Sequence, residues 1–172
     1  MADIRGFPLN LRISLSDDWI EHKRIEDGPA VRLVEFRCKS EDAFLGITLR
    51  GFEPAPNAAA GMRAEFAKPP HQLWPGDVDT VRGCLGEIGS PNMFEIAGAR
   101  TSSIGGRDAL VVEGRWHVAA YDAYNIFVPV TSECSRLQEI YFVAPGDVFQ
   151  RHIAVIKSAI ATVRWTSAET ST

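Results

Sequence analysis

The sequence lacks the short motifs that mark the commonest enzyme classes. It contains no nucleophile elbow G-x-S-x-G, no phosphate loop G-x-x-x-x-G-K-S/T, no dinucleotide fingerprint G-x-G-x-x-G and no zincin motif H-E-x-x-H. The four histidines are scattered, and no two are three or four residues apart, the spacing that places two ligands on one helix face. We therefore predict no catalytic residue, no cofactor and no metal.

Long hydrophobic runs and an excess of positive charge are also missing. The longest apolar stretches fall far below the roughly 20 residues that a membrane-spanning helix requires, so we expect no membrane insertion. The first residues show no basic segment that leads into an apolar segment with a cleavage site, which favours a cytoplasmic location. The 22 Asp and Glu residues outnumber 18 Lys and Arg, and the net charge of -4 argues against nucleic acid as a partner.

Cysteine is scarce, and its pattern predicts neither disulfides nor zinc. Cys38, Cys84 and Cys134 are odd in number, widely separated and without a C-x-x-C pair. Buried or idle thiols in a reducing compartment explain them. For Cys134 two interpretations stay open: a reactive thiol beside Arg136, which Glu133 would oppose, or an exposed turn cysteine without a role.

The length and composition suit one domain. With 172 residues, 45% of them hydrophobic, the chain can bury a full core. A chain of this size buries about 70% of the surface of its unfolded form, so it requires no disulfides and no structural metal. We assign the domain to residues 1–165, with a proline-rich insertion at 53–76, and we expect residues 166–172 to form a disordered polar tail.

Seven segments are predicted to be strands, most of them because apolar and polar residues alternate with a period of two. The segments are 9–15, 19–25, 31–38, 44–52, 107–118, 124–130 and 137–143. Turn residues at 26–29 join the second and third segments in a hairpin. The last three segments are expected to pair in sequence as antiparallel strands.

Three helices are predicted between and after these strands. Prolines bound a short helix within 57–67, and Asp77 is the expected N-cap of a second helix. The third helix begins where Asp147 and Gln150 resemble a capping box. Its apolar residues form one stripe: Phe149, Ile153, Ile156, Ile160 and Val163.

These elements predict a single α+β domain built on a largely antiparallel, twisted sheet of six to eight strands. We expect the C-terminal helix and the middle helices to cover one face of the sheet. The other face is then partly open, as is common for antiparallel sheets. Such a face can accept a peptide or helix through apolar anchors rimmed by polar residues.

Three segments mark the opening, the middle and the end of the predicted domain. They are Ile13-Ser-Leu-Ser-Asp-Asp-Trp19, Gly105-Gly-Arg-Asp-Ala-Leu-Val-Val-Glu-Gly114, and Ile140-Tyr-Phe-Val-Ala-Pro-Gly-Asp-Val-Phe149 with the helix that follows. Together with the element order they resemble the PsbP-like superfamily, which includes the photosystem extrinsic protein, nuclear Ran-binding proteins, and the DcrB and Eag chaperone families. The proline-rich insertion at 53–76 departs from that pattern. The resemblance implies a domain that binds other proteins and performs no catalysis.

One face of the 107–118 strand carries the candidate binding residues. Alternation places Val111, Glu113, Arg115 and His117 together, where they could orient a polar ligand or simply form a solvated sheet face. Trp74 gives the proline-rich insertion an aromatic character, which is typical of a recognition loop but also of a loop packed on its own domain.

The leading functional hypothesis is a noncatalytic protein-binding domain that acts as a chaperone, adaptor or assembly factor, related to a secretion system or acting as an immunity protein. Its binding residues would be Trp74, Val111, Glu113, Arg115, His117 and Tyr141. The alternative is a small-ligand binding protein or minor enzyme that uses a pocket around His117 and Glu113. A protein partner is expected, with the chain itself a monomer or a homodimer.

Overall fold

The computed structural model describes residues 1–28 and 30–166, which form a single α+β domain, as predicted. The strands are β1 (Ala2–Ile4), β2 (Asn10–Ile13), β3 (Trp19–Asp27), β4 (Ala30–Cys38), β5 (Phe44–Leu49), β6 (Phe94–Ile104), β7 (Arg107–Trp116), β8 (Tyr121–Pro129), β9 (Leu137–Pro145) and β10 (Arg164–Thr166). The helices are α1 (Pro56–Phe66), α2 (Pro75–Val81), the 3-10 turns η1 (Arg82–Cys84) and η2 (Gly86–Gly89), and α3 (Gly146–Ala161).

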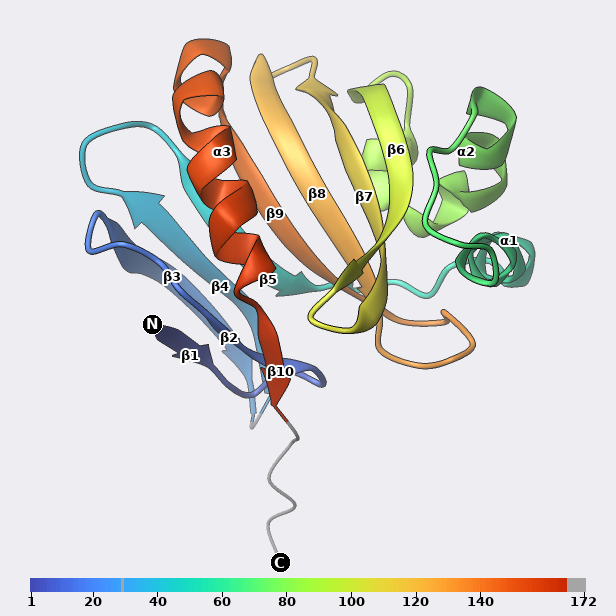
Figure 1. Ribbon diagram of the computed structural model, residues 1–172, viewed down its shortest axis with the longest axis horizontal. Helices are drawn as coiled ribbons and strands as arrows, with labels where there is room; N and C mark the ends of the chain where they lie inside the picture. Colours follow the sequence, from blue (N-terminus) through green and yellow to red (C-terminus); the bar gives the residue numbers. More distant parts are fainter. Residues whose placement is uncertain (29, 167–172) are drawn as a thin grey trace, which may run out of the picture.

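The strands form two antiparallel sheets. The larger has seven strands in the order β3-β4-β5-β9-β8-β7-β6, and the smaller has three in the order β1-β2-β10. The hairpin of β3 and β4 and the sequential pairing of β7, β8 and β9 confirm the sequence prediction. The helix α3 lies across the large sheet, and α1 and α2 lie at its β6 end (Figure 1).

Alternation along each central strand sends side chains into two separate apolar cores. On β9, Ile140 and Phe142 enter a first core that the small sheet and α3 cover, together with Phe149 and Ile156 of α3. The predicted stripe of α3 therefore packs as expected. Leu137 points the opposite way, into a second core beneath the helical layer formed by α1, α2, η1 and η2.

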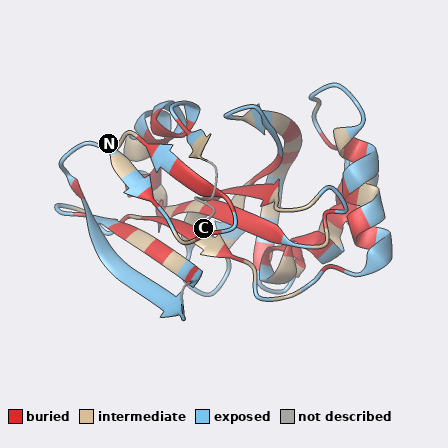
Figure 2. Cartoon of the chain, turned by 90° about the horizontal axis from the view of Figure 1, so that it is seen from below, coloured by how far each residue is buried: buried red, intermediate tan, exposed pale blue. Residues whose placement is uncertain are grey.

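The helices thus lie on opposite faces of the sheet, and the prediction that they share one face is wrong. Buried residues run through the middle of the molecule between these layers (Figure 2). Nearly all buried side chains in the two cores are apolar, so each layer is held by removal of apolar surface from water. A face that the helices leave uncovered must therefore be sought on the side away from α3.

The helical layer covers only part of that side. The second core contains residues of β6, β7, β8 and β9, but none from β3, β4 or β5. We call the uncovered part the open face. It consists of Ile20, Lys23, Ile25, Leu33, Glu35, Arg37, Phe44, Gly46, Thr48, Tyr141 and Val143, which the pairing register places on one side of four neighbouring strands.

Three strands escaped the sequence prediction. The longest is β6, whose stretch from Ala97 to Ser103 is small or polar and contains Gly98 at a bulge, so its alternation is weak. The others, β1 and β10, have three residues each and are recognisable only because both pair with β2. Of the predicted tail, Thr166 ends β10, and residues 167–172 lie outside the described residues.

Two predicted helix caps are wrong in detail. Asp77 is the third residue of α2 instead of its N-cap, and its carboxylate accepts a hydrogen bond from the backbone N–H of Trp74 at 3.0 Å. Asp147 is the second residue of α3, whose N-cap is Pro145, and its carboxylate accepts a hydrogen bond from Arg151 one turn later at 3.2 Å. Within the described part of the chain, no helix is long and apolar enough to cross a membrane.

Candidate functional site

The predicted binding strand presents its side chains to α3. Val111 is fully buried in the core under that helix, so it cannot contact a partner. Glu113 lies on the same side and forms ion pairs with Arg100 at 3.0 Å and Lys157 at 3.1 Å. Because Lys157 belongs to α3, this cluster ties the helix to the sheet.

Arg115 and His117 do not complete a site with Glu113. Arg115 pairs with Asp122 on the neighbouring strand at 3.3 Å. His117 lies beyond the end of β7, is exposed, and bonds through its ring to the carbonyl oxygen of Pro91 at 3.1 Å. The interactions of His117 and Glu113 therefore lead to different elements: His117 to the loop at Pro91, and Glu113 to β6 and α3.

Trp74 and Tyr141 lie on two further surfaces. Trp74 is 75% exposed at the start of α2. Tyr141 lies on the sheet side opposite Glu113, because its register partner Asn125 alternates with Tyr124, the partner of Glu113. Of the predicted binding residues, Tyr141 is the one that belongs to the open face.

Tyr141 is the polar centre of the open face. Its ring lies directly over Gly46 of β5, and its hydroxyl donates a hydrogen bond to Glu35 of β4 at 2.6 Å. Burial raises the pKa of Tyr141, and the adjacent Glu35 carboxylate raises it further. The phenol is therefore a neutral donor that holds β4, β5 and β9 in register.

Substitution Gly46→Ala is expected to destabilise this centre by about 1–3 kcal/mol, because a Cβ atom at Gly46 would lie 2.1 Å from Cζ of Tyr141. Urea unfolding measures the loss. The matched control is Gly51→Ala, where an added Cβ meets nothing within 4 Å and the free energy of unfolding should change by no more than about 0.5 kcal/mol. Equal effects of the two substitutions would show that Tyr141 is not seated on Gly46.

Apolar side chains elsewhere on the open face reach solvent. Ile20 and Ile25 on β3 are 47% and 41% exposed. Phe44 is half-buried, with the guanidinium of Arg37 5.9 Å from its ring centroid and the ring of His22 at 6.1 Å. The open face thus combines exposed apolar groups with charged side chains of both signs.

Arg50 forms the border between the open face and the helical layer. Its guanidinium forms an ion pair with the buried Glu139 at 2.6 Å and donates to the carbonyl oxygen of Leu85 in the helical layer at 2.8 Å. The rings of Phe52 and Phe127 lie on it at 5.2 and 5.7 Å. Burial raises the pKa of Glu139, and Arg50 opposes that shift.

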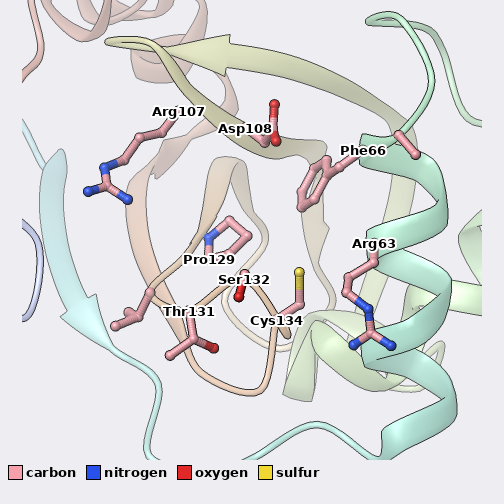
Figure 3. Close-up of a pocket in the computed structure, with 10 residues that line it drawn as sticks. Arg63, Phe66, Arg107, Asp108, Pro129, Thr131, Ser132 and Cys134 are labelled. Carbon is pink, nitrogen blue, oxygen red and sulfur yellow. The ribbon is translucent and has the colours of Figure 1, made fainter.

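A cavity of about 540 Å³ lies on the other flank of the helical layer, between α1, the β6–β7 turn and the loop after β8 (Figure 3). Arg63 and Arg107 line it, and so do Asp108, Thr131 and Cys134. Charges of both signs therefore lie along its wall. None of the histidines lines it, so no imidazole base stands beside its hydroxyl and thiol groups.

Burial makes the thiols of Cys84 and Cys134 weaker acids. Cys134 is buried, contrary to the prediction of an exposed turn cysteine, and burial raises the pKa of its thiol. Burial likewise raises the pKa of Cys84 to about 12. Both groups are therefore neutral thiols at physiological pH, and all three cysteines are free.

Comparison with known proteins supports the fold and nothing narrower. No family model matches the chain. No curated protein matches it either. The solved structure of LpqN, a protein of Mycobacterium tuberculosis involved in cell envelope biogenesis, is similar with a TM-score of 0.56 and 11% sequence identity over 92% of this chain and 84% of LpqN. The chain therefore has the α+β architecture of LpqN.

A second solved structure is less similar. It is PA94 from Pseudomonas aeruginosa, a protein of unknown function described as a candidate regulator. Its TM-score is 0.49, with 13% identity over 88% of this chain and 94% of PA94. The fold assignment rests on LpqN alone.

Proposed function

We propose that this chain is a noncatalytic protein-binding domain that holds an apolar segment of a partner protein on its open face. The observation that carries the proposal is the incomplete helical layer: within residues 1–28 and 30–166, no residue of β3, β4 or β5 belongs to the core that this layer covers. Proteins that act alone rarely leave a large contiguous apolar surface uncovered. Exposed isoleucines there are consistent with a face that a partner covers.

The chemistry of the open face indicates the kind of segment that fits. Phe44 and Val143 are register partners on neighbouring strands and offer adjacent apolar contacts where the open face meets the helical layer. Lys23, Arg37 and Glu35 bring charges of both signs to the same surface, as in the polar rim of protein interfaces. A partner segment with apolar anchors and flanking polar groups would match both the apolar contacts and the charged side chains of the open face.

Within this class, a chaperone, adaptor or assembly factor is our proposal. The resemblance to PsbP-like proteins supports it, since that superfamily commonly binds other proteins. An immunity protein belongs to the same class and would bind one folded partner tightly in a one-to-one complex. We keep the cytoplasm as the proposed location because all three cysteines are free, as is usual in reducing compartments.

The test compares two double variants in affinity purification from the native cell. Phe44→Thr with Val143→Thr removes this adjacent apolar pair of the open face, whereas Val118→Thr with Val155→Thr makes a similar polar change at valines exposed elsewhere, to 86% and 55%. We expect a stoichiometric partner whose recovery falls about tenfold or more with the first pair, equivalent to about 1.4 kcal/mol, and is unchanged with the second.

Recovery is measured by quantitative mass spectrometry, and the mass of the complex by size-exclusion chromatography with light scattering. Equal recovery with both variants would place the partner elsewhere on the domain and overturn the proposal. Absence of any stoichiometric partner would overturn it as well. Circular dichroism melting verifies that both variants remain folded.

A further inference from the structure

The two edges of the large sheet differ in the backbone segments that bond to them. At the β6 edge, the backbone N–H of Leu73 donates to the carbonyl oxygen of Ala99, and the N–H of Thr101 donates to that of His71, both at 2.9 Å. The segment 71–73 thereby covers that edge. Among the described residues, none other than those of β4 pairs with β3 at the opposite edge.

The β3 edge is long, exposed and partly apolar. All residues from 20 to 27 are exposed, and this part of β3 is the long pale-blue strand at the lower left of Figure 2. Edge strands of this length normally carry protection against pairing with another chain, and β3 has a lysine, Lys23, and a bulge beside it. This protection does not extend over the whole edge. Ile20 and Ile25 instead present apolar side chains along this edge.

A β-bulge at His22 determines which way each side chain of β3 points. Register partners on β4 show that Ile20, Lys23 and Ile25 lie on the open face. Trp19, Glu21, Arg24 and Glu26 lie opposite buried residues of the first core and point to the other side. His22 contacts Phe44 and so belongs to the open-face side. The bulge therefore brings Ile20 and Ile25, five positions apart, onto the same face.

This order of side chains permits one register for antiparallel pairing of β3 with β3 of a second copy. It excludes the adjacent registers. When Ile20 lies opposite Ile25 of the second copy, Glu21 lies opposite Arg24 and His22 opposite Lys23, and every pair points to the same side. A shift of one or two residues either way places an open-face residue opposite one from the other side, which a shared ladder does not allow.

The two-fold axis of this pairing passes between His22 and Lys23, at the bulge. A bulge usually interrupts pairing at an edge because one strand carries an extra residue. In the pairing of two β3 strands, both strands carry the extra residue at symmetry-related positions. The irregular part of one strand therefore lies opposite the irregular part of the other. The result is an isologous contact, in which the same surface of each copy is used.

We propose that the chain forms a homodimer through antiparallel pairing of β3 with β3 of a second copy, in the register that joins Ile20 to Ile25 and Glu21 to Arg24. Each copy already holds Glu21 and Arg24 as a bidentate pair at 2.8 and 2.9 Å. In the dimer these two pairs meet as a ring of four alternating charges, and each Ile20 covers an Ile25.

The dimer joins two open faces into one surface that crosses the two-fold axis. Only this consequence rests on the proposed function, because the dimer itself requires no partner. The mass of the purified chain therefore tests the dimer, whereas the variants at Phe44 and Val143 test partner binding. Either proposal can fail without the other.

The first test uses engineered cysteines, which the three native cysteines do not obscure because all are buried. Under mild oxidation, a mixture of Ile20→Cys and Ile25→Cys chains should give a disulfide-linked heterodimer. Ile20→Cys alone should give at least tenfold less linked product, because residue 20 does not face its own copy. The control mixture pairs Ile25→Cys with Val155→Cys on α3, which is 55% exposed and outside the interface.

The second test reverses charges. Glu21→Arg and Arg24→Glu should each reduce the mass in light scattering from twice 18.9 kDa to 18.9 kDa, and mixing the two variants should restore the doubled mass. Arg136→Glu is the matched control, since Arg136 is exposed on another element, and it should leave the dimer intact. A wild-type chain that is monomeric at 200 micromolar (about 4 mg/ml), or a dimer insensitive to these changes, would overturn the proposal.

Discussion

Replacement of Arg50 by Met is expected to lower the free energy of unfolding by about 3–5 kcal/mol at pH 7. The reason is that the buried carboxyl of Glu139 would lose the guanidinium that now lies 2.6 Å away, which leaves a buried acidic group without its charge partner. The methionine retains much of the apolar stem, so the loss isolates the ion pair and the hydrogen bond to Leu85. Urea unfolding monitored by tryptophan fluorescence measures it.

The pH dependence of the same variant has a definite sign. Burial raises the pKa of Glu139 above its ordinary value, and removal of Arg50 removes the opposing influence. A carboxyl whose pKa is higher in the folded state stabilises the fold below its unfolded pKa of about 4.3, and this contribution is lost as the pH rises through the folded pKa. The deficit of Arg50→Met should therefore shrink as the pH falls from 7 towards 5.

The double variant Arg50→Met with Glu139→Gln is the control. It removes the buried charge together with its partner, and it should recover most of the lost stability, since replacing both members of a buried pair is often nearly neutral. A deficit that is independent of pH, or one that the second substitution does not reduce, would contradict the assignment of Glu139 as a buried charge.

Replacement of Phe142 by Ala is expected to cost about 3–5 kcal/mol. Phe142 is fully buried, stacks on Phe149 of α3 at 5.2 Å between ring centroids, and meets Trp19 edge-on at 6.2 Å. Its removal leaves a cavity where α3, β3 and β9 meet. Thermal and urea unfolding measure the effect.

The control for Phe142 is its neighbour Val143, which alternation places on the other side of the sheet. Val143 is half-buried at the edge of the helical layer, so Val143→Ala should cost clearly less, about 1 kcal/mol. Comparable losses of unfolding free energy at the two positions would contradict this prediction. They would mean that the side chains of β9 in the first core contribute no more to stability than those on its other side.

Most helices and strands could be predicted from the sequence because turn residues and the spacing of apolar residues indicate them locally. The turn at Gly28 and the β-rich runs beside it sufficed for the hairpin of β3 and β4. The stripe of apolar residues in α3 predicted its buried side. By contrast, β6 is predictable only weakly, because its middle residues are small or polar and its pairing with β7 depends on contacts across the sheet.

The candidate site was harder to predict for a geometric reason. The alternation of β7 correctly groups Val111 with Glu113 and Arg115, but it does not say which group faces a helix. In the fold, α3 covers that group, and the open face forms instead on β3, β4, β5 and β9. The alternation of Phe44, Gly46 and Thr48 was visible in the sequence, and only the position of α3 makes it the uncovered side.

The sequence by itself determined the α+β class, the strand periods, the C-terminal helix and the absence of recognised catalytic motifs. These follow from residue spacing, since a period of two or 3.6 is a property of neighbouring residues. The tertiary structure alone decided that the helices lie on opposite faces and that segment 71–73 covers the β6 edge. It also decided that, among the described residues, β3 pairs with β4 alone. Those outcomes depend on where the chain crosses the sheet, which is a matter of long-range packing and is not written in any local pattern.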